Sequence, residues 1–111
     1  MASGIKGAVK PAGGSPTYAT TAIVTATATT TLILSACNQA AAADTLRIAV
    51  IPASQSASTG AIASEYYIEY DFSLGANAAM ERTGIVLETG ARLIVGSGNG
   101  DISFVAYGLE S

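Results

Sequence analysis

The chain has 111 residues, which is the size of a single domain, and a formal net charge of −3. Only 12% of its residues are charged, and its five lysines and arginines are scattered, so no basic patch for nucleic acid is expected. Histidine is absent, which removes the commonest general acid or base and metal ligand near neutral pH. The composition therefore predicts one small domain with no catalytic residues, no cofactor and no metal.

Residues 1–16 contain four glycines and two prolines and have little to bury. A segment of this composition is not expected to fold alone, so it is interpreted as an extended N-terminal arm that a partner holds in place. The β domain is then expected to span residues 17–111. The residues of the arm predicted to touch the partner are Ile5, Lys6, Val9, Lys10 and Pro11.

Apolar and polar residues alternate with a period of two after residue 17, which predicts strands near 18–26 and 29–37. The stretch Leu34-Ser35-Ala36-Cys37 is similar to a bacterial lipoprotein cleavage site, but the preceding segment is too rich in threonine for a signal peptide. The single Cys37 rules out an internal disulfide and is expected to be a small buried side chain. No run of 18 apolar residues predicts a helix across a membrane.

A strand is predicted from Asp44 to Pro52, because proline cannot donate to a sheet ladder, and a long loop of small residues follows over 53–64. Residues 65–74 give the clearest alternation in the chain. The face expected in the core carries Tyr66, Ile68, Tyr70, Phe72 and Leu74. The face expected to meet solvent or a partner carries Glu65, Tyr67, Glu69, Asp71 and Ser73.

Further strands are predicted over 80–88, with Gly84 as a candidate bulge, over 91–96 and over 102–109. The segment Gly96–Asp101 is interpreted as a hairpin loop between the last two strands. About seven strands without a convincing helix predict an all-β, antiparallel β-sandwich of the Ig-like or jelly-roll type.

Three carboxylates, those of Glu65, Glu69 and Asp71, share one strand face, with about 7 Å between alternate residues. Paired carboxylates can serve a glycosidase or hold calcium. The simpler interpretation is a solvent-exposed strand face, because neither an aromatic-lined cleft nor a calcium-loop pattern accompanies them. Arg82 and Arg92 are candidate partners for these carboxylates.

Three segments of the C-terminal half carry a resemblance: Glu65-Tyr66-Tyr67-Ile68-Glu69-Tyr70-Asp71, Leu74-Gly75-Ala76-Asn77 and Glu81-Arg82-Thr83-Gly84-Ile85-Val86-Leu87. Together with Val105-Ala106-Tyr107-Gly108-Leu109-Glu110, they resemble small virion structural proteins of tailed phages, notably phages of cyanobacteria and other marine bacteria. The Thr-rich first strands share the likeness more loosely. The resemblance implies a β-sandwich without enzymatic activity that sits on a viral particle.

A capsid decoration or cement protein is the function expected from this resemblance. Its place would be the capsid surface of the virion, after synthesis in the host cytoplasm. Its partners would be the major capsid protein and copies of itself, as a homotrimer, and not nucleic acid, membrane or a small-molecule substrate. The expected subunit interface consists of Tyr67, Glu69, Asp71, Arg82 and Arg92.

Three alternatives stay open. One is a tail, baseplate or fibre component of the same kind of virion. Another is a carbohydrate-binding β-sandwich module, for which Tyr18, Tyr67 and Tyr107 could supply an aromatic platform. The last is a hydrolase that uses the carboxylates of residues 65–71.

Overall fold

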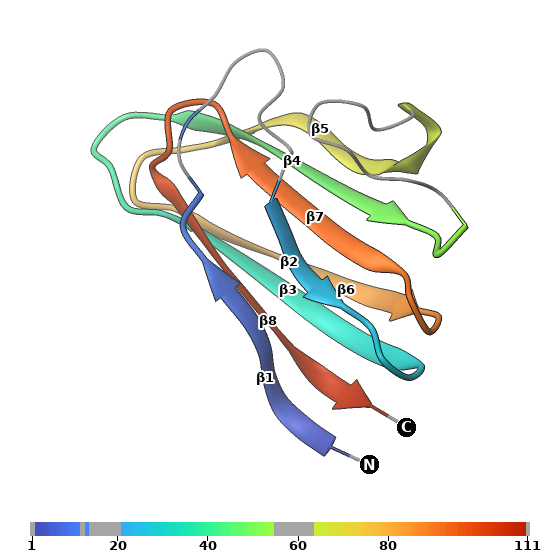
Figure 1. Ribbon diagram of the computed structural model, residues 1–111. Helices are drawn as coiled ribbons and strands as arrows, with labels where there is room; N and C mark the ends of the chain where they lie inside the picture. Colours follow the sequence, from blue (N-terminus) through green and yellow to red (C-terminus); the bar gives the residue numbers. More distant parts are fainter. Residues whose placement is uncertain (1, 12, 14–20, 55–63, 111) are drawn as a thin grey trace.

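A computed structural model describes residues 2–11, 13, 21–54 and 64–110, and within them eight strands form two four-stranded antiparallel sheets (Figure 1). In sheet order, sheet A consists of β1 (Ala2–Val9), β8 (Ile102–Glu110), β3 (Thr30–Asn38) and β6 (Ala79–Leu87). Sheet B consists of β2 (Thr21–Thr25), β7 (Arg92–Ser97), β4 (Asp44–Ile51) and β5 (Tyr67–Leu74). A single 3₁₀ turn, η1 (Ser64–Tyr66), precedes β5. The predicted all-β antiparallel sandwich is confirmed.

The pairing of the strands identifies the sandwich as a jelly roll. The first strand pairs with the last, β2 with β7, β3 with β6, and β4 with β5. This is the pattern of one long antiparallel ribbon folded over itself, which places eight strands in two sheets. Except for β4 and β5, strands that follow each other in the chain lie in opposite sheets.

This topology corrects the interpretation of Gly96–Asp101 as a hairpin loop. Strand β7 belongs to sheet B and β8 belongs to sheet A, so the loop crosses from one sheet to the other. Buried Asp44 accepts hydrogen bonds from the backbone N–H groups of Asn99, at 2.9 Å, and Asp101, at 3.2 Å. The loop is therefore held by the start of β4, and not by pairing between the strands that it joins.

The core lies between the sheets and consists of side chains at alternate positions. Burial alternates along β3, whose Leu32, Leu34 and Ala36 point inward, and along β8, whose Ile102, Phe104 and Ala106 do the same. A second, smaller cluster lies on the outer side of sheet B. It contains Ala49, Ile51 and Ile94, with Tyr66 and Tyr67 packed against them.

The described part of the N-terminal segment does not extend away from the domain. Residues 2–9 form the edge strand β1, which runs antiparallel to β8 from Ala2 opposite Glu110 to Val9 opposite Phe104. Val9 packs against the core and Pro11 is buried, so the predicted extended arm is not confirmed here. Gly7 lies so close to the Ile23 carbonyl oxygen that a side chain would have no room, and this glycine therefore serves close packing. Residues 1, 12 and 14–16 of the predicted arm lie outside the described residues.

Cys37 was expected to be buried, but its side chain is exposed on the outer face of sheet A. Its neighbours Ala36 and Asn38 are buried positions of β3, so the alternation of the strand turns Cys37 outward.

No helix in the described ranges is long and apolar enough to cross a membrane. Residues 18–20 of the first predicted strand and 55–63 of the predicted loop are not among the described residues.

Candidate functional site

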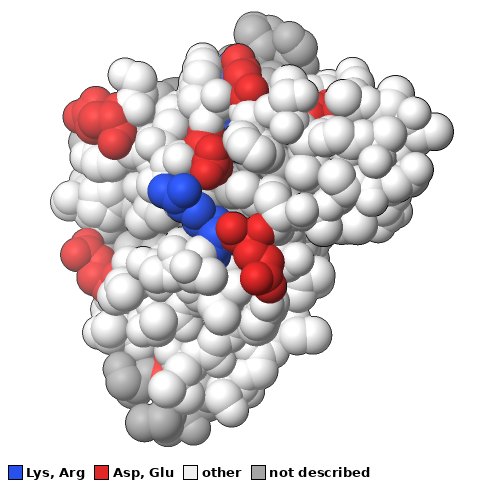
Figure 2. All heavy atoms as spheres, turned by 180° about the vertical axis from the view of Figure 1, so that it is seen from behind, with Lys and Arg blue, Asp and Glu red and all other residues white. Residues whose placement is uncertain are grey.

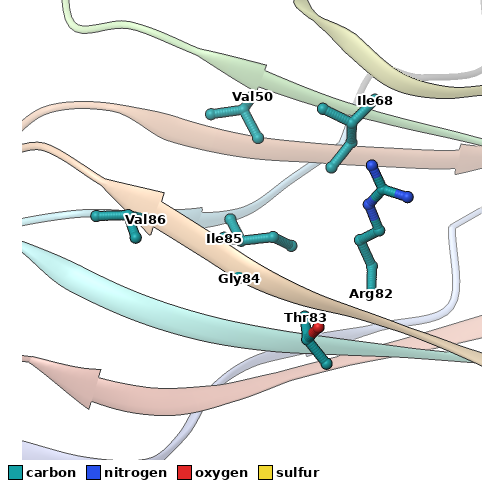
Figure 3. A pocket seen from close by; sticks show the side chains of 7 residues that line it. All are labelled: Val50, Ile68, Arg82, Thr83, Gly84, Ile85 and Val86. Atoms are coloured by element: carbon teal, nitrogen blue, oxygen red, sulfur yellow. The ribbon is translucent and has the colours of Figure 1, made fainter.

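A cavity of about 290 Å³ opens along one side of the sandwich, where sheet B and strand β6 face each other (Figure 3). Val50 and Ile68 approach it from sheet B and Ile85 approaches it from β6, while Val86 lies at its border with its side chain turned away from the other three. The Arg82 guanidinium extends toward Ile68, and Thr83 points away from these side chains. A second cavity of about 230 Å³ shares Val50 and Val86 and is also lined by Pro52, Tyr66, Glu88 and Ala91.

A bulge in β6 shapes this cavity. The pairing with β3 shifts between Leu34, opposite Arg82, and Leu32, opposite Ile85, and Gly84 adopts a φ of 74°. Because of the shift, Arg82 and Ile85 lie opposite inward-facing residues although they are three residues apart. The candidate bulge at Gly84 is therefore confirmed.

Arg82 pairs with Glu69, as the sequence indicated. Its Nη1 donates to Glu69 Oε2 at 3.0 Å, with the arginine partly exposed and the glutamate mostly buried. The two charges compensate each other at the rim of the cavity. The side chains that line the two cavities are mainly aliphatic, with Arg82, Thr83, Tyr66 and Glu88 as the polar ones.

Strand β5 carries a second cluster, centred on Arg47. The pairing of β5 with β4 leaves both Tyr70 and Asp71 opposite Arg47, because Phe72 faces Leu46 and Glu69 faces Ile48. Arg47 Nε donates to Asp71 Oδ1 at 2.7 Å, and Nη2 donates to Oδ2 at 3.3 Å. The guanidinium carbon lies 4.0 Å from the centroid of the Tyr70 ring, a cation–π contact.

The irregular pairing corrects the predicted faces of β5. Ile68 packs against the core and Leu74 is buried, as expected, but Tyr70 and Phe72 are exposed. Asp71 adopts a φ of 56°, a left-handed conformation that interrupts the alternation of a strand. Arg47 was not among the partners predicted for Asp71, which were Arg82 and Arg92. The pairing of 44–51 with the next strand would have suggested it.

The ten residues predicted from the sequence form two groups, five in the N-terminal segment and five in β5, β6 and β7. Tyr67 makes an edge-on contact with the Tyr70 ring, with the two ring centroids 4.9 Å apart. Arg92 begins β7, opposite Ile51 of β4, and so lies in the other sheet from Arg82. Lys6 Nζ lies 3.9 Å from Glu110 Oε1, and Ile5 and Lys10 are exposed.

The outer face of sheet A is the surface that the sequence analysis missed. Its outward positions follow from the burial pattern of the central strands β3 and β8 and from the registers that join them to the edge strands. We call this set the sheet A face. It consists of Ser3, Ile5, Ala8, Thr31, Ile33, Ser35, Cys37, Ala79, Glu81, Val86, Ser103, Val105, Tyr107 and Leu109.

Glu81 is the one charged residue of the sheet A face. It accepts a hydrogen bond of 2.9 Å from the Tyr107 hydroxyl, and this bond raises the pKa of Tyr107 above its ordinary value. Ile5, Val86 and Leu109 are 72%, 58% and 44% exposed. The face is therefore largely apolar or small in its side chains and open to solvent.

Seen from behind relative to Figure 1, the molecule carries basic side chains mainly in one central spot with acidic side chains beside them, and further acidic side chains lie toward the left and upper edges (Figure 2). Comparisons with models of protein families, with curated proteins and with solved structures found no match. The functional argument therefore depends on these surfaces and cavities.

Proposed function

We propose that this chain is a structural protein of a phage virion, of the capsid decoration or cement type, which binds the outer shell and stabilises it. The observation that carries the proposal is the sheet A face. Exposed apolar side chains gathered on one face, here Ile5, Val86 and Leu109 among small and hydroxyl residues, are typical of surfaces where other proteins bind. A chain with only 12% charged residues is also weakly protected against association, which suits a protein that works in an assembly.

The fold adds support only by analogy. Jelly rolls occur in viral capsid proteins and also in lectin-like domains, so the architecture is compatible with the proposed role but does not select it. The phage resemblance of the C-terminal segments supports the virion context. The internal pairing of Arg82 with Glu69, and of Arg47 with Asp71, agrees with polar groups that hold the domain together.

The test is the composition of purified particles of the phage that encodes the chain. A decoration protein is expected in a copy number comparable with that of the major shell protein, measured by quantitative gel electrophoresis. Purified chain added to particles that lack it should bind until saturation and should raise the temperature at which the shell opens. Absence from the particle would overturn the proposal, and a much lower copy number would favour a tail, baseplate or fibre component.

A second candidate, a carbohydrate-binding module, is favoured by one observation. Tyr70 is 59% exposed, and its ring is held by Arg47 and Tyr67 in a cluster that also contains the Asp71 carboxylate. A fixed aromatic ring beside polar groups suits the apolar face of a sugar. Specific binding on a glycan array that is lost in Tyr70→Ala would promote this candidate. Of the tyrosines first considered for a platform, Tyr18 lies outside the described residues.

A further inference from the structure

The two outer faces of the sandwich differ in how much of their apolar surface the chain covers. On sheet B, the outward apolar side chains of Ala49, Ile51 and Ile94 are buried, with Tyr66 and Tyr67 packed against them. On sheet A, outward apolar side chains such as Ile5, Val86 and Leu109 stay exposed. Sheet B exposes Tyr70 and Phe72 on its edge strand β5, whereas the exposed apolar side chains of sheet A are spread over β1, β8 and β6, which leaves the larger uncovered face on sheet A.

The size of the sheet A face suits one protein partner. Strands β3 and β8 have nine residues each, so the face is about 30 Å long at a rise of about 3.3 Å per residue. Four strands spaced by about 4.8 Å make it about 19 Å wide. Two such faces in contact would bury about 1,100 Å², which lies near the lower end of specific interfaces.

The charge of the face points to its own copy as the partner. A charged partner would find a complementary group only for Glu81, whereas a second sheet A face offers the same small, apolar and hydroxyl side chains over the same area. Glu81 lies on the edge strand β6 and already accepts the Tyr107 hydroxyl. A two-fold arrangement that stacks β6 over β1 of the other copy keeps the two Glu81 carboxylates at opposite edges.

We infer that two copies of this chain pack face to face through the sheet A face, as a homodimer with two-fold symmetry. The inference goes beyond the proposed function, because it names a second copy of the chain as the partner that covers the sheet A face and leaves other surfaces for the shell. Aligned sheets pack about 10 Å apart with interdigitated side chains, and residues of this size can fill that space. In a dimer with two-fold symmetry, both copies use the same surface patch, so that patch must be complementary to itself.

The first test is the mass in solution as a function of concentration. Sedimentation or light scattering should show the mass rising from that of one chain, 11.0 kDa, toward twice that value. The variant Ile5→Lys/Val86→Lys adds a charge at each edge strand of the face, at exposed positions that the fold should tolerate. It should stay monomeric at concentrations where the parent chain dimerises. Ala41→Lys/Ala76→Lys adds the same charge at exposed loop positions off the face and should still dimerise.

Cys37 provides a second readout, because it is the single cysteine, is exposed and belongs to the sheet A face. Its reaction with a maleimide should slow at least fivefold between dilute protein and a concentration at which the dimer predominates. In the matched control Cys37→Ser/Ala76→Cys, the reacting thiol lies in a loop, so its rate should not change with concentration. A dimer or trimer with an unprotected Cys37, or a monomer at every concentration, would overturn the inference.

These outcomes separate the inference from the proposed function. If the chain is monomeric in solution but saturates phage particles, the decoration role is supported and the face-to-face dimer is contradicted. If the chain dimerises with a protected Cys37 but is absent from particles, the dimer is supported and the decoration role is contradicted.

Discussion

At the scale of single residues, polar side chains in this protein hold loops in place. Asp44 is 3% exposed and accepts the backbone N–H groups of Thr45, Asn99 and Asp101. Asn38 donates from Nδ2 to the carbonyls of Ala42, Leu74 and Gly75. Since a jelly roll joins its sheets by loops at the ends, these two residues replace the pairing that a hairpin would supply.

Replacing Asp44 tests this role. Asp44→Ala leaves the N–H groups of Asn99 and Asp101 without this acceptor, so we expect a loss of about 2–5 kcal/mol in the free energy of unfolding. Asp44→Asn keeps one side-chain oxygen and should lose about 1–2 kcal/mol. Urea denaturation measures both, with Glu65→Ala, at an exposed position of η1, as a control expected within about 0.5 kcal/mol of the parent. Equal midpoints for Asp44→Ala and the control would show that these bonds do not stabilise the loop.

Tyr107 and Glu81 make a pH-dependent contact on the sheet A face. The hydrogen bond to Glu81, desolvation by burial and the charge of Glu81 raise the pKa of Tyr107, so the folded state holds this proton more tightly than the unfolded state. Its contribution to stability is present below the ordinary pKa of about 10 and is lost as pH rises through the higher folded value. NMR of the Tyr107 ring should show a titration midpoint above the ordinary tyrosine pKa. The variant Glu81→Gln should move that midpoint to lower pH. An unchanged midpoint in Glu81→Gln would contradict the assignment.

At the scale of strands, glycines mark where backbones approach or turn. A Cβ at Gly108 of β8 would overlap the Thr31 carbonyl of β3, and neither backbone can move away without breaking the sheet. Gly84 has open space around it but a φ of 74°, while Gly75 has neither restriction. Alanine variants at these three glycines therefore measure the cost of steric overlap and the cost of a left-handed backbone conformation separately.

The corresponding alanine variants should rank in that order. We expect Gly108→Ala to cost at least about 2–3 kcal/mol in the free energy of unfolding, because it overpacks two strands. Gly84→Ala should cost about 1–2 kcal/mol, because the left-handed conformation disfavours a side chain. Gly75→Ala should lie within about 0.5 kcal/mol of the parent chain. Chemical denaturation of all three decides the order, and a Gly84→Ala variant less stable than Gly108→Ala would reverse the explanation.

Strand positions could be predicted from the sequence where the alternation is regular. The strand predicted over 102–109 is β8, with Ile102, Phe104 and Ala106 buried on one face, and Pro52 follows the end of β4 as predicted. The faces of β5 could not be predicted, because two irregularities in its pairing with β4 depend on contacts with another strand. The bulge at Gly84 could be predicted from the sequence, because glycine is the residue that a left-handed backbone conformation favours.

At the scale of the whole molecule, the jelly-roll pairing decides which surfaces exist. Residues 2–9 look poor in apolar side chains, but β8 offers them a free edge, so they complete sheet A. The sheet A face then combines β1, β8, β3 and β6, which are distant in the chain, and no local pattern predicts it. Predicted site residues such as Glu69 and Arg82 could be paired from charge alone, whereas a face made of small and apolar residues gave no comparable signal.

The salt dependence of self-association separates two descriptions of the interface. The sequence analysis placed subunit contact on Tyr67, Glu69, Asp71, Arg82 and Arg92, and ion pairs between copies would weaken as salt screens them. The sheet A face has Glu81 as its one charge, so its association constant should change less than about threefold between 50 and 500 mM NaCl. Sulfate at the same ionic strength should strengthen association, because it favours burial of apolar surface. Sedimentation across these salts measures both effects. A steep loss of dimer with rising NaCl would contradict the sheet A face and indicate that the charged residues of β5 and β6 form the interface.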